Sequence, residues 1–301
     1  MNIKELEREL CSYGIEDGRT EAYLIIERLF GVGRSKLLLE RERDFASAEL
    51  NEVLKKRKER VPLQYIFGEW EFMGNKFLVS EDCLIPQPDT EILTEKAIEI
   101  LKKWQGVDEI NAKCKMQNAK LTTFPSHECD TLVADLCTGS GCIGLSLLLH
   151  GATDRVMLMD ISKGALGMAQ KNAKLHGLEN RCNFVLGDIC RDMPNAKYRM
   201  IVSNPPYIPT KDIEGLPEEV KKEPHLALDG GDDGLDLIRF LLGDGLSHLQ
   251  ENGVMLIEFG FDQGDKMDAL LREKRDTGSI KSYEILRDYG NNPRVAVIYG
   301  N

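Results

Sequence analysis

The residues with the clearest capacity for chemistry are Asn204-Pro205-Pro206-Tyr207, which follow the apolar run at residues 200–202. Neither proline can donate a ladder hydrogen bond, so the predicted strand ends here, and Pro206 biases Pro205 toward an extended backbone. The turn is therefore stiff, and it presents the Asn204 side chain and nearby backbone carbonyls as fixed acceptors beside the Tyr207 ring. This arrangement suits a planar NH2 group, which offers two N–H donors and a flat body for stacking.

A second candidate site is the Gly-rich turn at residues 137–141, Cys-Thr-Gly-Ser-Gly, between a predicted buried strand at 131–136 and a predicted helix at 142–149. Such a turn lets a ligand approach the backbone at the N-terminus of the helix. The spacing matches G-x-G, and Gly144 fits the third glycine of the dinucleotide fingerprint only loosely. The turn alone is therefore a weak indication.

Acidic residues stand at the ends of the strands that must position these turns. Asp135 lies in the first strand, Asp160 ends a predicted strand at 155–159, and Asp188 follows one at 182–186. Because ligands of open α/β sheets bind at the carboxyl ends of the strands, Asp160 is placed to accept two ribose hydroxyls and Asp188 an adenine amine. For Asp135, direct ligand contact and support of the Gly-rich turn through backbone N–H groups carry equal weight.

Taken together, these motifs resemble those of S-adenosylmethionine-dependent methyltransferases of the Rossmann-like class. The Asn-Pro-Pro-Tyr turn resembles that of enzymes that methylate adenine N6, cytosine N4 or a glutamine amide. Further segments resemble one branch, the release factor glutamine N5-methyltransferase family of the HemK/PrmC type. These segments are residues 61–68, 84–91, 160–162, 223–231 and 234–236, so the resemblance spans about residues 60–301 and, more loosely, the N-terminus.

The resemblance and the apolar patterning together predict the architecture. Helical spacing of apolar residues predicts a helical N-terminus, and alternation around Gly74-Asn75 predicts a β-hairpin. The expected fold is α/β, with a Rossmann-like seven-stranded methyltransferase domain and a small N-terminal helical domain joined by a β-hairpin. The expected boundaries are a helical substrate-docking domain at 1–72, a hairpin linker at 73–88 and the methyltransferase domain at 89–301.

The spacing of apolar residues predicts the remaining strands and helices. The four further strands are predicted at about 200–203, 253–258, 280–288 and 294–299, and helices at 89–104, at 235–249 and from about Gln263. Residues 105–130 are polar and aperiodic, which favours an extended loop. The Pro-, Glu- and Gly-rich segment 208–234 is expected to be a long loop that closes over the substrate.

The resemblance also implies the roles of the site residues. The catalytic and substrate-binding residues would be Asn204, Pro205, Pro206 and Tyr207. The cofactor, S-adenosylmethionine with S-adenosylhomocysteine as product, would be bound by Asp135, Cys137, Thr138, Gly139, Ser140, Gly141, Asp160, Asp188 and Asn204. No metal is expected.

The implied substrate is the glutamine of the Gly-Gly-Gln motif of a peptide chain release factor, methylated on its side-chain amide nitrogen. Two alternatives stay open: an amino-methyltransferase acting on adenine N6 or cytosine N4 of a nucleic acid, and a non-catalytic protein that binds S-adenosylmethionine. The chain departs from the usual family pattern in having Gln87 and Asp89 where Arg and Glu are usual, and Cys137 where Gly is frequent. The change to Gln87 removes a guanidinium from the expected site, and the change to Cys137 exchanges one small residue for another.

Composition limits the other possibilities. The chain has 301 residues and a net charge of −11, which disfavours direct binding to duplex nucleic acid. No signal-peptide core or membrane-length apolar run is found, so a cytoplasmic protein is expected. The 8 cysteines include no Cys-x-x-Cys pair and none with histidine at ligand spacing, as expected for small apolar residues in a reducing compartment.

Overall fold

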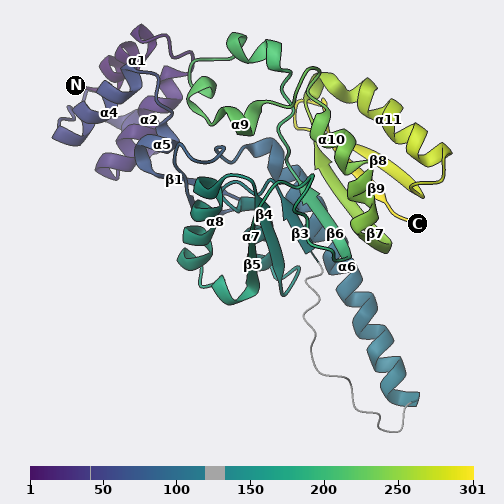
Figure 1. The fold of residues 1–301 in the computed structure, drawn as a ribbon. Coiled ribbons are helices and arrows are strands. Elements are labelled where there is room, and N and C mark those ends of the chain that lie inside the picture. The colour runs from purple at the N-terminus through teal and green to yellow at the C-terminus, as the bar shows by residue number, and fades with distance from the viewer. Residues whose placement is uncertain (41, 119–132) are drawn as a thin grey trace. The chain divides into compact units, whose positions relative to one another are not determined.

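The computed structural model describes residues 1–40, 42–118 and 133–301, with the backbone alone for residues 107–118. The chain divides into two units. We call Met1–Gly68 with Leu216–Lys222 the helical unit, and Glu69–Gly215 with Glu223–Asn301 the sheet unit. Both are coloured along the chain in Figure 1.

The helical unit contains a core of its own. Apolar residues at helical spacing form it, among them the fully buried Leu6, Leu10 and Ile26. Asn2 begins the first helix with a capping box that it forms with Glu5. The helices are α1 (Ile3–Ser12), α2 (Gly18–Phe30), α3 (Arg34–Leu39), α4 (Ala48–Lys58) and α5 (Leu63–Phe67), with the 3₁₀ turn η3 (Val220–Lys222) in the returning segment.

A buried ion-pair cluster holds the returning segment in the helical unit. The Arg57 side chain is 1% exposed and donates to both carboxylate oxygens of Glu21 at 2.8 and 2.9 Å. It also donates to Glu219 at 3.0 Å and to the Val61 carbonyl at 2.7 Å. Arg60 donates to Glu219 as well, at 2.7 Å from Nε. Glu219 is thereby fixed by two guanidinium groups, although it lies about 160 residues along the chain from them.

The sheet unit contains a seven-stranded sheet in the order β5-β4-β3-β6-β7-β9-β8. The first five strands in this order are parallel, and β9 pairs antiparallel with both β7 and β8. The prediction of a seven-stranded Rossmann-like sheet is confirmed. The strands are β3 (Val133–Leu136), β4 (Val156–Asp160), β5 (Cys182–Leu186), β6 (Tyr198–Ser203), β7 (Leu249–Glu258), β8 (Ser282–Arg287) and β9 (Pro293–Tyr299).

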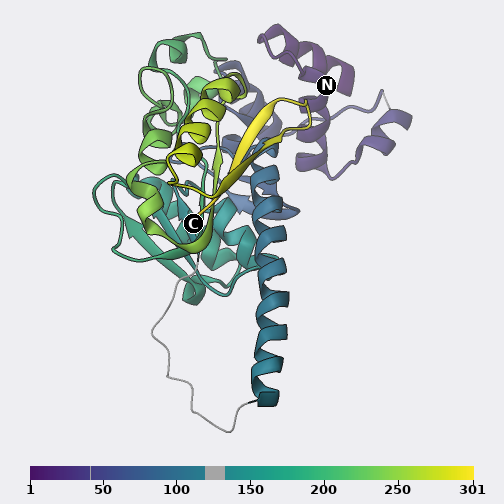
Figure 2. The same ribbon diagram turned by 90° about the vertical axis from the view of Figure 1, so that its right-hand side faces the viewer.

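Helices cover both faces of this sheet, as Figures 1 and 2 show. Because side chains alternate along a strand, Val202 joins the core beneath α6, α7 and α8, while Ile201 joins the core beneath α10 and α11. The helices are α6 (Pro88–Asn118), α7 (Cys142–Leu149), α8 (Lys163–Leu175), α9 (His225–Leu228), α10 (Asp236–Leu241) and α11 (Gly264–Asp276), with 3₁₀ turns η1 (Glu179–Arg181), η2 (Thr210–Gly215), η4 (Asp244–His248) and η5 (Phe261–Gln263).

The hairpin consists of β1 (Glu69–Phe72) and β2 (Asn75–Leu78) and belongs to the sheet unit. Phe72 and Phe77 lie in the core beneath α6, α7 and α8. The Asn172 side chain of α8 accepts from the Leu78 N–H at 2.6 Å and donates to the Leu78 carbonyl at 2.9 Å, so it binds β2 as a strand would. The linker role of residues 73–88 and the three predicted domain boundaries stay predictions.

Three predicted elements differ from the structure. Helix α6 continues to Asn118, so residues 105–118 are not a loop, and the rest of that predicted loop lies outside the described residues. After Gly106 this stretch contains no glycine or proline to break a helix. The helix predicted at 235–249 ends at Leu241, because Gly243 leaves helical geometry with φ −107° and ψ −106°. The predicted loop 208–234 contains η2, η3 and the single turn of α9.

Among the described residues, no helix is long and apolar enough to cross a membrane.

Candidate active site

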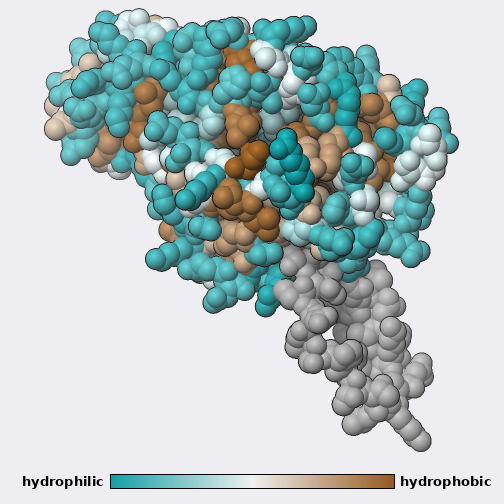
Figure 3. Space-filling model, viewed as in Figure 1, coloured by the Kyte–Doolittle hydropathy of each residue, from teal (hydrophilic) through white to brown (hydrophobic). Residues whose placement is uncertain are grey.

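The carboxyl ends of β3, β4, β5 and β6 meet at one edge of the sheet and border a cavity of about 340 Å³. This volume falls at the small end of ligand pockets, which measure about 300–1,000 Å³. On the face drawn in Figure 3, apolar side chains gather in the central part of the molecule. Of the predicted site residues, the cavity is lined by Cys137, Thr138, Gly139, Ser140, Asp160, Asp188, Asn204 and Pro206.

The Gly-rich turn presents open backbone to this cavity. Gly139 has φ +57°, and a Cβ built on it would meet nothing within 4 Å. Cys137 has φ +58°, a left-handed conformation that favours glycine, so the cysteine found here strains the backbone by about 1–2 kcal/mol. The turn ends at Gly141, the N-cap of α7, and the N-terminus of a helix favours a negatively charged ligand group.

Asp135 lies behind this turn and supports it. Its Oδ2 accepts from the Thr138 hydroxyl at 2.6 Å and from the Gly144 N–H at 2.9 Å. The residue is fully buried and is not among those that line the cavity. Burial raises the pKa of Asp135 to about 7, and the hydrogen bonds from Thr138 and Gly144 oppose that shift. These contacts favour the interpretation in which Asp135 holds the turn.

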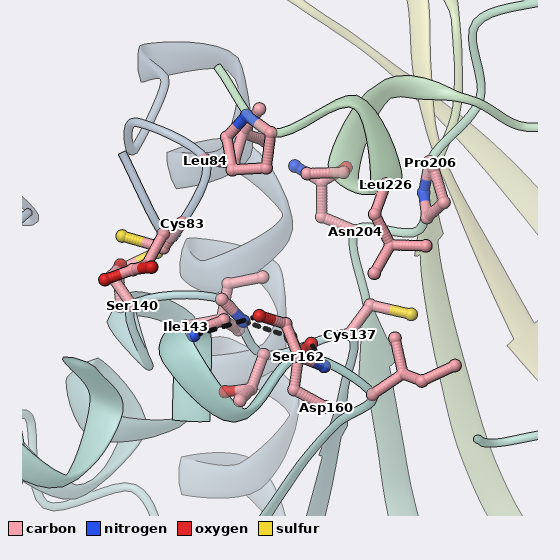
Figure 4. Close-up of a pocket in the computed structure, with 18 of the residues that line it drawn as sticks. Cys83, Leu84, Cys137, Ser140, Ile143, Asp160, Ser162, Asn204, Pro206 and Leu226 are labelled. Carbon is pink, nitrogen blue, oxygen red and sulfur yellow. Dashed lines mark hydrogen bonds between the residues drawn. The ribbon is translucent and has the colours of Figure 1, made fainter. Parts of the chain in front are cut away.

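Asp160 lies at the tip of β4, facing the turn. Its two carboxylate oxygens accept from different backbone N–H groups, Oδ2 from Gly139 and Oδ1 from Ser162, each at 2.8 Å. Figure 4 draws both bonds. Burial raises the pKa of this carboxyl, while the same N–H groups favour its charged form. Each oxygen keeps a further lone pair for a ligand hydroxyl.

Asp188 follows β5 and lines the cavity. Its Oδ1 accepts from the Cys190 N–H at 2.9 Å, and its Oδ2 lies 3.4 Å from Nε of Arg191. Ile161 and Leu226, which also line the cavity, are 52% and 54% exposed. The cavity thus combines carboxylates, among them Asp160 and Asp188, with apolar walls, a lining that suits a ligand with both a polar sugar and a flat apolar ring.

The Asn204 side chain is held at the opposite wall of the cavity (Figure 4). Its Nδ2 donates to the Thr90 hydroxyl at 3.1 Å. Among the described residues, none donates to Asn204 Oδ1 or to the Pro205 carbonyl, whereas the Tyr207 carbonyl accepts from Gln263 Nε2 at 2.8 Å. The turn therefore has two acceptors without donors, as its sequence predicts.

Pro205, Tyr207, Asp135 and Gly141 are not among the residues that line the cavity. The Tyr207 hydroxyl donates to Oε1 of Glu258 at 3.3 Å. Glu258 is 1% exposed at the end of β7, and burial raises its pKa to about 7. The predicted stacking of Tyr207 on a substrate stays a prediction.

Several lining residues carried no predicted role. They come from the segment before α6, from the first turn of α6 and from the loop after Asp188, and they are Cys83, Leu84, Ile85, Gln87, Thr90, Ile189 and Cys190. The segment 84–91 had been noted only for its resemblance, and its Pro86-x-Pro88 pattern was the available signal of a fixed wall. Near it, Arg294 pairs with Asp89 at 3.1 Å and with Asp288 at 3.1 Å. The departure at position 89 thus retains a carboxylate that binds a guanidinium.

The chain is similar to known proteins over its whole length. Residues 3–68 match the family model described as PrmC N-terminal domain, and residues 118–219 match the one described as Methyltransferase small domain. The release factor glutamine methyltransferase of Moorella thermoacetica is 35% identical over 300 residues, which cover 99% of this chain and 96% of that protein. The protein of the same name from Aquifex aeolicus is 32% identical, covering 99% and 95%.

Among solved structures, the ribosomal protein L11 methylase of Lactobacillus delbrueckii subsp. bulgaricus aligns with a TM-score of 0.43 and 19% identity, over 73% of this chain and 81% of that one. The two full-length relatives decide the assignment, because both exceed 30% identity over nearly the entire chain. The chain belongs to the release factor glutamine methyltransferase family and is a methyltransferase.

Proposed function

We propose that this protein transfers a methyl group from S-adenosylmethionine to the side-chain amide nitrogen of the glutamine in the Gly-Gly-Gln motif of a peptide chain release factor. The observation that supports the proposal most is the pair of acceptors, Asn204 Oδ1 and the Pro205 carbonyl, that have no donor among the described residues, beside a cavity lined by the Asp160 and Asp188 carboxylates. The names of the full-length relatives supply the substrate class.

The residues of the cavity fit the proposed cofactor. Asp160 would accept the two ribose hydroxyls and Asp188 the adenine amine. The open face of Gly139 leaves room for the ligand, and the buried Ser140 hydroxyl, which has no partner among the described residues, could bind it. When bound, S-adenosylmethionine supplies a methyl group activated by a sulfonium. The protein's own task is then to hold the acceptor nitrogen in line and to exclude water.

The turn would hold the substrate amide through its two N–H bonds, one to Asn204 Oδ1 and one to the Pro205 carbonyl. An amide nitrogen is a weak nucleophile, because its lone pair is delocalised. As the nitrogen gains positive charge in the transition state, both oxygens bind its protons more strongly than in the ground state. This difference lowers the barrier, and the methylated nitrogen then loses one proton to solvent, which leaves a neutral N-methyl amide.

The helical unit would dock the release factor, with residues 1–72 as the docking domain and 73–88 as the linker. The net charge of −11 supports a protein substrate over a nucleic acid, because nucleic-acid binding relies on cations that neutralise phosphates.

The test is transfer of labelled methyl from S-adenosylmethionine to purified release factor. Parallel acceptors are the factor with its Gly-Gly-Gln glutamine changed to alanine, total DNA and total RNA. We expect label on the unchanged factor alone. Label on nucleic acid with none on the factor would overturn the proposal and support the alternative, an adenine-N6 or cytosine-N4 methyltransferase.

A further inference from the structure

The carboxamide of Asn204 has two ends, and only one of them can accept a hydrogen bond from a substrate NH2 group. If the group rotated by 180°, its own NH2 would face the substrate NH2, donor against donor. Something must therefore hold the oxygen toward the cavity. The contact in the structure that can do so is the bond from Asn204 Nδ2 to the Thr90 hydroxyl oxygen at 3.1 Å.

Thr90 is well placed to act as a fixed acceptor. It is 2% exposed and lies in the first turn of α6, where its N–H donates to the Gln87 carbonyl at 3.1 Å. Its carbonyl accepts from the Thr94 hydroxyl at 3.1 Å. Being β-branched, its side chain has few rotamers in a helix, so the hydroxyl oxygen has little freedom to move away.

A hydroxyl both donates and accepts, so the direction of its own proton decides what Asn204 meets. Because Asn204 Nδ2 carries only protons, Thr90 meets it with a lone pair of its hydroxyl oxygen, and the Thr90 proton points elsewhere. The bond is made in this orientation of the carboxamide, with Nδ2 toward Thr90 and Oδ1 away from it.

We propose that Thr90 is a positioning residue, which fixes the Asn204 carboxamide with Oδ1 toward the substrate. This proposal rests on the proposed acceptor role of Asn204. It adds a contact between α6 and the turn after β6. Thr90 lines the cavity, and its part in this scheme is to hold Asn204.

The first variant is Thr90→Val, which keeps the side-chain shape and removes the hydroxyl. We expect kcat to fall roughly 10-fold, as for loss of one hydrogen bond of ordinary strength, with the Kd of S-adenosylhomocysteine unchanged. Thr90→Ser should keep kcat within about 3-fold of the wild type, because it restores the hydroxyl. Thr153→Val is the matched control and should leave kcat unaltered, because this buried threonine does not line the cavity and its hydroxyl donates to the Arg155 carbonyl at 3.0 Å.

The decisive comparison repeats Thr90→Val in an Asn204→Asp background. A carboxylate presents an oxygen whichever way it turns, so loss of the Thr90 hydroxyl should then change kcat by less than about 2-fold, whatever the starting rate. An equal loss in both backgrounds, failure of Thr90→Ser, or a matching loss in Thr153→Val would overturn the proposal. The assay uses whichever acceptor the wild type labels, so a failure of the release-factor assignment shows in the wild type and is distinguishable from a failure of Thr90.

Discussion

Replacing Asp160 by asparagine tests the proposed cofactor site most sharply. The carboxylate accepts from Gly139 and Ser162 through different oxygens, each at 2.8 Å. An amide retains one oxygen, so one of these N–H groups would face an NH2 group. The same change removes the charge that would accept the ribose hydroxyls. We therefore expect weaker cofactor binding in a protein that still folds.

The size of the effect follows from the two ribose bonds. A hydrogen bond to a charged group contributes about 1.5–3 kcal/mol and a neutral one about 0.5–1.5 kcal/mol. When the Asp160 charge is removed, each of the two ribose hydrogen bonds changes from the charged to the neutral kind. The loss is about 2–3 kcal/mol in total, or a roughly 30- to 150-fold rise in the Kd of S-adenosylhomocysteine. The clash with a backbone N–H adds to this value.

The assay is calorimetric titration with S-adenosylhomocysteine. Asp154→Asn is the matched control, because this side chain lies just before β4, is fully exposed and pairs with Arg181 at 3.6 Å. We expect binding to the control to equal that of the wild type. If Asp160→Asn also binds within about 3-fold of the wild type, the carboxylate does not hold the cofactor and the proposed site is wrong.

Two further predictions concern stability. Burial raises the pKa of Asp135 from 3.8 to about 7, so its contribution to the free energy of unfolding is complete below about pH 4 and is lost as the pH rises through 7. Asp135→Asn should therefore remove up to about 4 kcal/mol of pH dependence in urea unfolding between these limits. Arg57→Met leaves Glu21 and Glu219 without their shared cation and should lower the free energy of unfolding by about 3–5 kcal/mol, with Arg57→Lys losing less.

Each stability prediction has a clear contrary result. An Asp135→Asn variant whose unfolding free energy varies with pH in parallel with the wild type would show that the buried carboxyl does not titrate as described. An Arg57→Met variant that loses less than about 1 kcal/mol would show that the buried cluster contributes no more than a surface ion pair.

The strands could be predicted from the sequence because the information is local. The apolar run 200–202 is followed by the prolines after Asn204, which fix where β6 ends. Asp160 is likewise the polar residue that follows an apolar run, and it is the last residue of β4. Since parallel strands bring their carboxyl ends to one edge, the meeting of these residues at a single cavity followed from topology alone.

The rest depends on contacts that no local pattern carries. Thr90 bonds Asn204 across 114 positions of the chain, and Glu219 joins a cluster with Arg57 across 162. The sequence did not predict the extension of α6 to Asn118, because residues 105–118 are polar and show no apolar face. A polar segment indicates a loop only where a helix would have to pack an apolar face against a core. Asp135 could not be assigned, because its sequence position fits ligand contact and turn support equally; its bonds to Thr138 and Gly144 distinguish them.

The most direct measurement of the proposed reaction is tandem mass spectrometry of a release factor incubated with this protein and S-adenosylmethionine. We predict one added methyl group on the side-chain nitrogen of the Gly-Gly-Gln glutamine, and none with the Asn204→Ala variant, which should still bind S-adenosylhomocysteine. A methyl group on another residue, or an unchanged product with Asn204→Ala, would contradict the proposal that this turn holds the glutamine amide for transfer.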